Sequence, residues 1–119
     1  MNVEHIIKTI RSYRLRFATE TQLQEDLAKA FAAENIEVQR ELILDQSNRI
    51  DLYIPSLKLG IECKIAGSPT AVLDQLIRYC KFAEIESLLL VTTRPQHRIP
   101  TPTLRGKPCQ TVWVGGSSL

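Results

Sequence analysis

Two acidic residues and a lysine interrupt the apolar middle of the chain, where burying unpartnered charges is costly. Asp51 lies in the stretch 48–54 (NRIDLYI), and Glu62 and Lys64 lie in 58–65 (KLGIECKI). Side chains alternate between the two faces of a strand, so Glu62 and Lys64 share a face, and a hairpin of the two stretches can place Asp51 beside Glu62. Neighbouring carboxylates repel each other unless a cation lies between them. Their oxygens suit Mg²⁺ or Mn²⁺, which also bind phosphate, so the pattern predicts a divalent-metal site.

Lys64 adds a second chemical group to this site. An ammonium beside two carboxylates can orient or deprotonate a water molecule, or balance the charge of a phosphate under attack. Each residue also has a simpler interpretation. Asp51 can pair with Arg49 at an edge strand, and Glu62 with Lys64 can form an exposed ion pair worth about 0–1 kcal/mol.

Helices are predicted at the start of the chain. Apolar residues recur at helical spacing over residues 2–14, which predicts a first amphipathic helix. Thr19 or Thr21 can cap a second helix that runs to about Glu34, since each threonine has a glutamine three residues later.

Strands and a third helix follow. The β-rich stretches 36–44, 48–54 and 58–65 are separated by short turns, which predicts an antiparallel meander. Ser68 and Pro69 mark the start of a helix that continues to about Ala83, where the alanine is expected to be buried. The apolar stretch 87–92 suits a central strand, 94–109 is predicted to be irregular, and 110–114 to be a last strand. This order predicts an α/β fold with a mixed central sheet flanked by helices.

These motifs together resemble a known nuclease family. Arg49-Ile50-Asp51, ten intervening residues and then Glu62-Cys63-Lys64 resemble the signature of the PD-(D/E)xK nuclease superfamily, with Ile50 standing where the signature has proline. The predicted elements resemble its restriction-endonuclease-like αβββαβ core. Gln75 to Tyr79 match the QxxxY motif of the RecB-like branch. The resemblance covers about residues 19–92 of a single domain spanning 1–119, and leaves the helix 2–14 and the basic segment 94–119 outside it.

The resemblance implies a role for each residue of the motif. Asp51 and Glu62, with the carbonyl group of Cys63, would hold Mg²⁺ or Mn²⁺. Lys64 would position the attacking water. Glu20 would assist through a water or a second metal.

The helices supply further candidates. With Leu27 at the centre of the buried face, Glu20 lies about 20° away and Glu25 about 160° away, so Glu20 is the better candidate for the helix carboxylate. Gln75 and Tyr79 are four residues apart and share a helix face. The resemblance implies that this face looks toward the active site, and the alternative is a core tyrosine with a surface glutamine.

Basic residues gather at both ends of the chain. Residues 1–18 carry a net charge of +3 and residues 94–119 carry +4, whereas residues 19–93 carry −5. Basic ends around an acidic centre suit a site that holds a cation and binds a polyanion. The candidates for phosphate contacts are Arg78, Arg94, Arg98, Arg105 and Lys107. Solvation of these side chains is the alternative.

Three aromatic residues are left without a functional role. His5 and His97 are isolated and show no metal-binding spacing. Trp113 lies at strand spacing between Val112 and Val114, which predicts a packing role in preference to a base-stacking one.

Composition excludes several classes of protein. With 44% hydrophobic and 24% charged residues, the chain is typical of a globular domain, and its apolar runs are too short for a transmembrane helix. The N-terminus lacks the pattern of a signal peptide. Three widely spaced cysteines form neither a zinc motif nor a complete disulfide framework. We therefore expect an intracellular, cytoplasmic protein with no membrane partner.

The sequence as a whole predicts a metal-dependent nuclease that hydrolyses phosphodiester bonds, with DNA as the substrate that the resemblance implies. A domain of this size has little surface for specificity, which favours a homodimer or a partner such as a helicase that delivers the substrate. The alternative is a non-catalytic nucleic-acid-binding or assembly module on the same fold. A structural α/β domain without a nucleic-acid role is a third interpretation.

Overall fold

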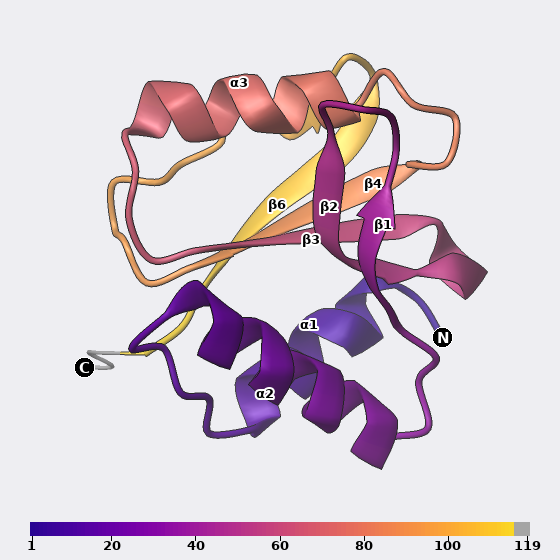
Figure 1. Cartoon of the computed structure of the whole chain (residues 1–119), viewed down its shortest axis with the longest axis vertical. Helices are drawn as coiled ribbons and strands as arrows, with labels where there is room; N and C mark the ends of the chain where they lie inside the picture. Colours follow the sequence, from indigo (N-terminus) through magenta and orange to yellow (C-terminus); the bar gives the residue numbers. More distant parts are fainter. Residues whose placement is uncertain (116–119) are drawn as a thin grey trace.

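The computed structural model of the chain describes residues 1–115, which form a mixed sheet with helices on both faces (Figure 1). The strand order is β1-β2-β3-β4-β6-β5. The elements in chain order are α1 (Val3–Ser12), α2 (Glu20–Ala33), β1 (Gln39–Ile43), β2 (Arg49–Ile54), the 3-10 turn η1 (Pro55–Leu57), β3 (Leu59–Lys64), α3 (Pro69–Tyr79), β4 (Ser87–Thr92), β5 (Thr103–Leu104) and β6 (Lys107–Trp113). The predicted α/β class and the αβββαβ order from α2 to β4 are confirmed.

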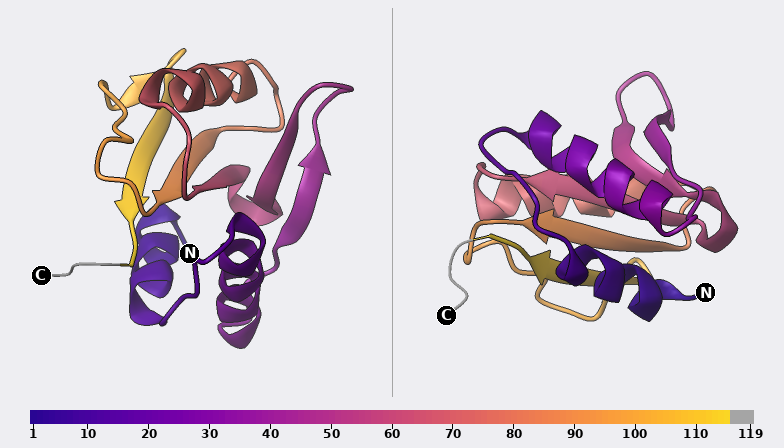
Figure 2. Two further views of the ribbon diagram at one scale, coloured as in Figure 1. Left: turned by 60° about the vertical axis from the view of Figure 1, so that its left-hand side comes forward. Right: turned by 90° about the horizontal axis from the view of Figure 1, so that it is seen from below.

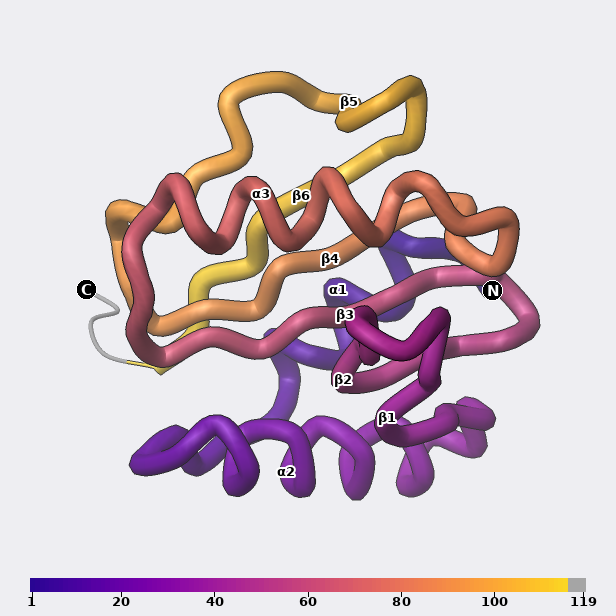
Figure 3. The backbone as a smooth tube through the Cα atoms, turned by 45° about the horizontal axis from the view of Figure 1, so that its top comes forward, coloured from indigo at the N-terminus to yellow at the C-terminus, as the bar shows by residue number. Residues whose placement is uncertain are grey.

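The sheet has an antiparallel half and a parallel half. β1 pairs with β2 and β2 with β3 in antiparallel register, as the predicted meander requires. β3, β4 and β6 are parallel to one another, and Lys64 at the end of β3 is level with Thr92, which is level with Trp113. The carboxyl ends of these three strands therefore meet at one edge of the sheet (Figure 3). The amino-terminal end of α2 lies at the same edge.

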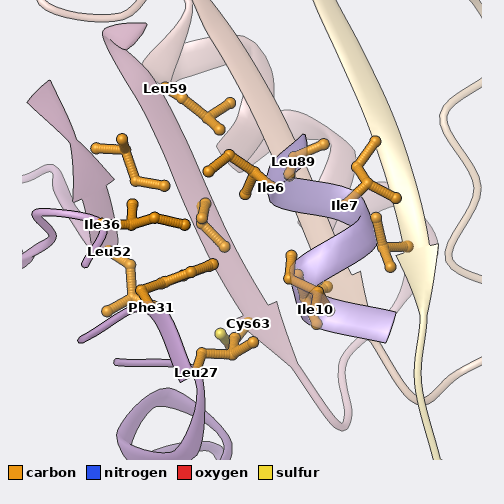
Figure 4. Close-up of a cluster of buried hydrophobic side chains, with 14 of the residues drawn as sticks. Ile6, Ile7, Ile10, Leu27, Phe31, Ile36, Leu52, Leu59, Cys63 and Leu89 are labelled. Atoms are coloured by element: carbon orange, nitrogen blue, oxygen red, sulfur yellow. The ribbon is translucent and has the colours of Figure 1, made fainter. Parts of the chain in front are cut away.

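The two sheet faces are covered by different helices. α1 and α2 pack on one face and α3 packs on the other (Figure 2). Apolar residues at helical spacing, such as Ile6 and Ile10 of α1 and Leu27 and Phe31 of α2, point into the first core. In Figure 4 the side chains of α1 and α2 meet the inward-facing residues of the strands, Cys63 among them. α1 and α2 therefore cover the face of β3 that carries Ile61 and Cys63, and the Glu62 side chain lies on the opposite face.

The second core, under α3, includes Ile50, Leu88 and Leu90 of the sheet. Gly60 of β3 is needed there because a Cβ atom at this position would collide with the side chains of Ile50 and Leu88. The absence of a side chain at Gly60 lets the side chains of Ile50 and Leu88 lie directly over the backbone of β3, two residues before Glu62.

Side-chain caps begin all three helices, and those of Thr19 and Ser68 are among the predicted ones. Asn2, Thr19 and Ser68 each accept a backbone N–H three residues later. The third helix is shorter than predicted, since α3 ends at Tyr79 and Ala83 is exposed. The chain turns through i to i+3 hydrogen bonds after Tyr79, which buries Ile85 and begins β4. The predicted burial of Ala83 is therefore wrong.

The segment 94–109 is more regular than predicted. β5 and the start of β6 form a hairpin joined by Arg105 and Gly106, which have φ values of +51° and +81°. Positive φ at both central residues is the geometry of a type I′ turn, for which Asn-Gly and Asp-Gly are the usual signals. Arg-Gly does not give that signal, and Pro108 argues against a strand, so the local sequence does not predict the hairpin.

Within residues 1–115, no helix is both long enough and apolar enough to cross a membrane. The three cysteines are free and buried.

Candidate active site

Asp51 and Glu62 lie side by side where β2 separates from β3. Regular pairing of the two strands ends at Leu52 and Ile61, and the β1–β2 hairpin turns away from β3 (Figure 1). Beyond that point, side-chain carboxylates replace backbone carbonyls as acceptors. Asp51 Oδ2 accepts the N–H of Cys63 at 2.8 Å, and Glu62 Oε1 accepts the N–H of Asp51 at 3.4 Å. The two carboxylates therefore accept the backbone N–H groups that lose their partners where the strands separate.

Lys64 and Glu20 lie beside Asp51 and Glu62 and complete a cluster of charged side chains at this edge of the sheet. Lys64 Nζ lies 3.6 Å from Glu62 Oε2, and its side chain is only 20% exposed. Glu20, in the first turn of α2, accepts the N–H of Ile65 at 3.2 Å, directly after Lys64. Glu25 instead lies 3.7 Å from Arg16 at the surface. The structure thus places Glu20, rather than Glu25, beside the motif.

Gln75 and Tyr79 connect α3 to the strand that carries Asp51. The Gln75 amide donates to the Tyr79 hydroxyl at 2.8 Å, and that hydroxyl donates to the carbonyl of Arg49 at 2.9 Å. Tyr79 is 1% exposed, so it is available to hold β2 rather than to contact a large substrate. Its geometry is that of a positioning residue.

Burial and nearby charges perturb the pKa values of the acidic groups. Burial, followed by the charge of Asp51, raises the pKa of Glu62 to about 8, against the opposing effect of Lys64. Burial also raises the pKa of Asp51, although the Cys63 N–H and the Lys64 charge act in the other direction. Burial and the nearby Glu62 charge raise the pKa of the Tyr79 hydroxyl. This electrostatic cost is typical of a functional site rather than of a structural ion pair.

A family model for the PD-(D/E)XK nuclease superfamily matches residues 3–97. The chain belongs to this superfamily. No curated protein and no solved structure matches it significantly. The sheet and its flanking helices are compatible with the restriction-endonuclease-like fold of this superfamily, as predicted.

PD-(D/E)XK nucleases typically use divalent metals, and the residues present fit such an ion. Asp51 and Glu62 bring two carboxylates together at a largely buried position, where the charge of Asp51 raises the pKa of Glu62 and the charge of Glu20 raises the pKa of Asp51. Among residues 1–115, no group of three or more His, Cys, Asp and Glu side chains is arranged to hold a metal. A pair of carboxylates suits Mg²⁺, which commonly takes one or two from the protein and completes its shell with water and phosphate.

The predicted phosphate-binding residues of this superfamily member divide between two edges of the sheet. Arg94 and Arg98 follow β4 and lie near the edge that carries Lys64. Arg105 and Lys107 lie at the opposite end of β6, about 20 Å along the strand from Trp113. Lys107 Nζ donates to the carbonyl of Phe82 at 2.8 Å, which gives it a structural contact. Arg78 is exposed and its Nε lies 3.4 Å from Asn48 Oδ1.

His97 is a residue of the site region that its sequence spacing does not reveal. It is 1% exposed, and its ring nitrogens lie 2.8 Å from Thr92 Oγ1 and 2.8 Å from the carbonyl of Gly67. It therefore joins the loop after β3 to the loop after β4. No local signal marks this role, because Gly67 is thirty residues away along the chain.

Replacing Tyr79 with phenylalanine tests the positioning contact. We expect Tyr79→Phe to lower the free energy of unfolding by about 1 kcal/mol, because the partly buried Arg49 carbonyl and the Gln75 amide lose their partner. Urea denaturation measures this change, and Tyr53→Phe, which loses a 2.6 Å hydrogen bond to the carbonyl of Glu84 and none to the acids or to Arg49, is the matched control. If Tyr79 positions Asp51, Tyr79→Phe slows cleavage as well, whereas Tyr53→Phe affects stability alone.

Proposed function

We propose that this chain is a divalent-metal-dependent deoxyribonuclease of the RecB-like branch. The observation that carries the proposal is the convergence of Asp51, Glu62 and Lys64 at one point between β2 and β3. Tyr79, which accepts from the Gln75 amide, donates to the Arg49 carbonyl of the strand that carries Asp51. A non-catalytic domain gains nothing from two buried acids whose charges destabilise the folded state. Membership in a nuclease superfamily supports phosphodiester hydrolysis in particular.

Each residue has a defined part in the proposed reaction. Asp51 and Glu62, with the carbonyl of Cys63, would hold Mg²⁺ or Mn²⁺. Such an ion, when bound, lowers the pKa of water and stabilises negative charge on the phosphate. Lys64 donates hydrogen bonds to the attacking water or to the phosphate, since its ammonium group is partly exposed and held beside Glu62. Glu20 holds the backbone that follows Lys64 and so keeps the end of β3 in place.

Cleavage of labelled DNA tests the proposal. Single-stranded, duplex, flap and four-way-junction substrates are incubated with Mg²⁺, Mn²⁺ or EDTA, and the products are separated by length. We expect cutting with either metal and none in EDTA. A preparation that is folded and binds DNA in a salt-sensitive way, yet cuts no substrate with either metal, would favour the non-catalytic binding module.

A further inference from the structure

The tryptophan near the end of β6 lies at the edge of the sheet that carries the acidic site. Lys64, Thr92 and Trp113 are level with one another across three neighbouring parallel strands. Residues paired in this way point to the same face, and two strand spacings separate Lys64 from Trp113 by about 10 Å. Figures 1 and 3 show the ends of these strands together.

Trp113 is 44% exposed, contrary to the packing role that its sequence position predicts. Its ring N–H donates to the carbonyl of Arg94 at 3.1 Å, so the polar atom of the ring is satisfied and its orientation is fixed. The ring is therefore a rigid apolar surface open to solvent. Phe17 is 38% exposed and lies beside Gly115. The Phe17 ring leaves no room for a side chain at position 115.

Two arginines lie near the Trp113 ring. The guanidinium of Arg98 lies 5.9 Å from the centre of the Trp113 ring, and Arg94 is exposed. Residues 94–119 contain no acidic residue. A surface hollow of about 500 Å³ adjoins the ring and is lined by Arg98, Pro100, Thr111 and Trp113, among others. Exposed aromatic rings combined with arginines are the features that bind single-stranded nucleic acid through base stacking and phosphate contacts.

We propose that Trp113, with Arg98 and Arg94, forms a stacking platform for an unpaired base of the DNA strand that enters the acidic site. This inference rests on the proposed nuclease function and names its substrate class. The distance of about 10 Å corresponds to about three nucleotides of a stacked strand. Bases in a duplex are covered by their neighbours, so the platform favours single strands, flaps and frayed ends over continuous duplex. An exposed cation–π contact is weaker than base stacking, so a base can displace Arg98, whose guanidinium is then free to bind phosphate.

Trp113 is the only tryptophan of the chain, so its emission reports directly on the platform. In EDTA, a short oligothymidylate is titrated into the wild-type protein, and a duplex of the same length serves as the comparison. We expect the single strand to quench the tryptophan emission strongly and the duplex to quench it weakly. Emission that does not change while anisotropy of the labelled single strand shows saturation would overturn the proposal.

Variants test which contacts matter. We expect Trp113→Ala to weaken binding of the single strand about tenfold and Trp113→Phe to retain most of the affinity, with duplex binding little changed. Arg98→Ala should reduce the salt dependence of binding by about one phosphate contact. Lys29→Ala, which removes one positive charge from the exposed side of α2, is the matched control and should leave both affinities nearly unchanged. Equal losses for single strand and duplex in Trp113→Ala would refute the stacking role.

The outcomes for the platform and for the nuclease are separable. Metal-dependent cutting by the wild type, with an unaltered ratio of single-strand to duplex cleavage in Trp113→Ala, overturns the platform and leaves the nuclease standing. Quenching by the single strand without any cutting supports the platform as a binding surface and overturns the nuclease.

Discussion

Lys64→Ala is expected to slow single-turnover cleavage of DNA by about 10²–10³-fold, the usual cost of removing one preorganised charge from the transition state. The lysine is the cation nearest the acids, with Nζ 3.6 Å from Glu62 Oε2. Alanine removes both the positive charge and the hydrogen-bond donor, while the carboxylates stay in place. Quenched-flow measurement with excess enzyme and saturating Mg²⁺ isolates the chemical step from product release.

The control for this experiment is Lys29→Ala, which removes a lysine from α2 on the far side of the helix from the core. It changes the net charge of the chain equally, so it reports the contribution of charge alone to DNA binding. Lys64→Ala is also expected to bind DNA with nearly wild-type affinity, because only one cation is lost. A single-turnover rate for Lys64→Ala within about threefold of the Lys29→Ala rate would rule out the catalytic role of Lys64.

Glu62→Gln is expected to abolish cleavage and yet stabilise the metal-free protein at high pH. Because the folded protein holds the Glu62 proton up to a pKa of about 8, against 4.5 for the free side chain, it binds more protons than the unfolded chain between these values. The free energy of unfolding therefore falls as the pH rises through this window. The shift sets an upper limit of about 5 kcal/mol, which water entry and side-chain relaxation reduce, and we expect a gain of about 2 kcal/mol at pH 8.5.

Urea denaturation in EDTA at pH 5 and at pH 8.5 measures this effect. Near pH 5 the wild-type carboxyl is largely neutral, so the two proteins should have similar stability. Exposed Glu37→Gln is the control and should change little at either pH. Two results would contradict the raised pKa of Glu62 in the folded protein. One is a Glu62→Gln protein that is less stable than the wild type at pH 8.5, and the other is a gain in stability at pH 5 as large as that at pH 8.5.

Repeating the urea denaturation with added metal tests whether the site binds an ion. An ion that binds the folded state alone stabilises it in proportion to the logarithm of its concentration. Added Mg²⁺ or Mn²⁺ should therefore stabilise the wild type at pH 8.5 and reduce the stability difference between it and Glu62→Gln. Together with the loss of cleavage, this result would show that the site sacrifices stability for function.

Much of the acidic site could be predicted from the sequence because its geometry is local. Strand alternation places the Glu62 side chain on the face opposite to those of Ile61 and Cys63, and a short connection returns β3 beside β2, so Asp51 meets Glu62 within one hairpin. The caps of the helices are equally local, since Thr19 and Ser68 each bind an N–H only three residues away. Short-range patterns of this kind are enough to predict the α/β class and the acidic motif.

Other features depend on where distant segments meet. Periodicity favoured Glu20 over Glu25, but only the packing of α2 against β3 provides its partner, the N–H of Ile65. His97 shows no spacing signal, because Thr92 and Gly67 come to it through the fold.

The basic segment shows the difference most clearly. In the sequence, Arg94, Arg98, Arg105 and Lys107 form one positive stretch. The parallel pairing of β6 with β4 places the first two near the acidic edge and the last two at the far end of the strand. The same pairing leaves Trp113 at the end of β6, exposed beside Arg98, where strand alternation alone predicted a packed side chain. The sequence thus determined which residues can perform chemistry, and strand direction, a property of long-range pairing, decided which of them lie near the site.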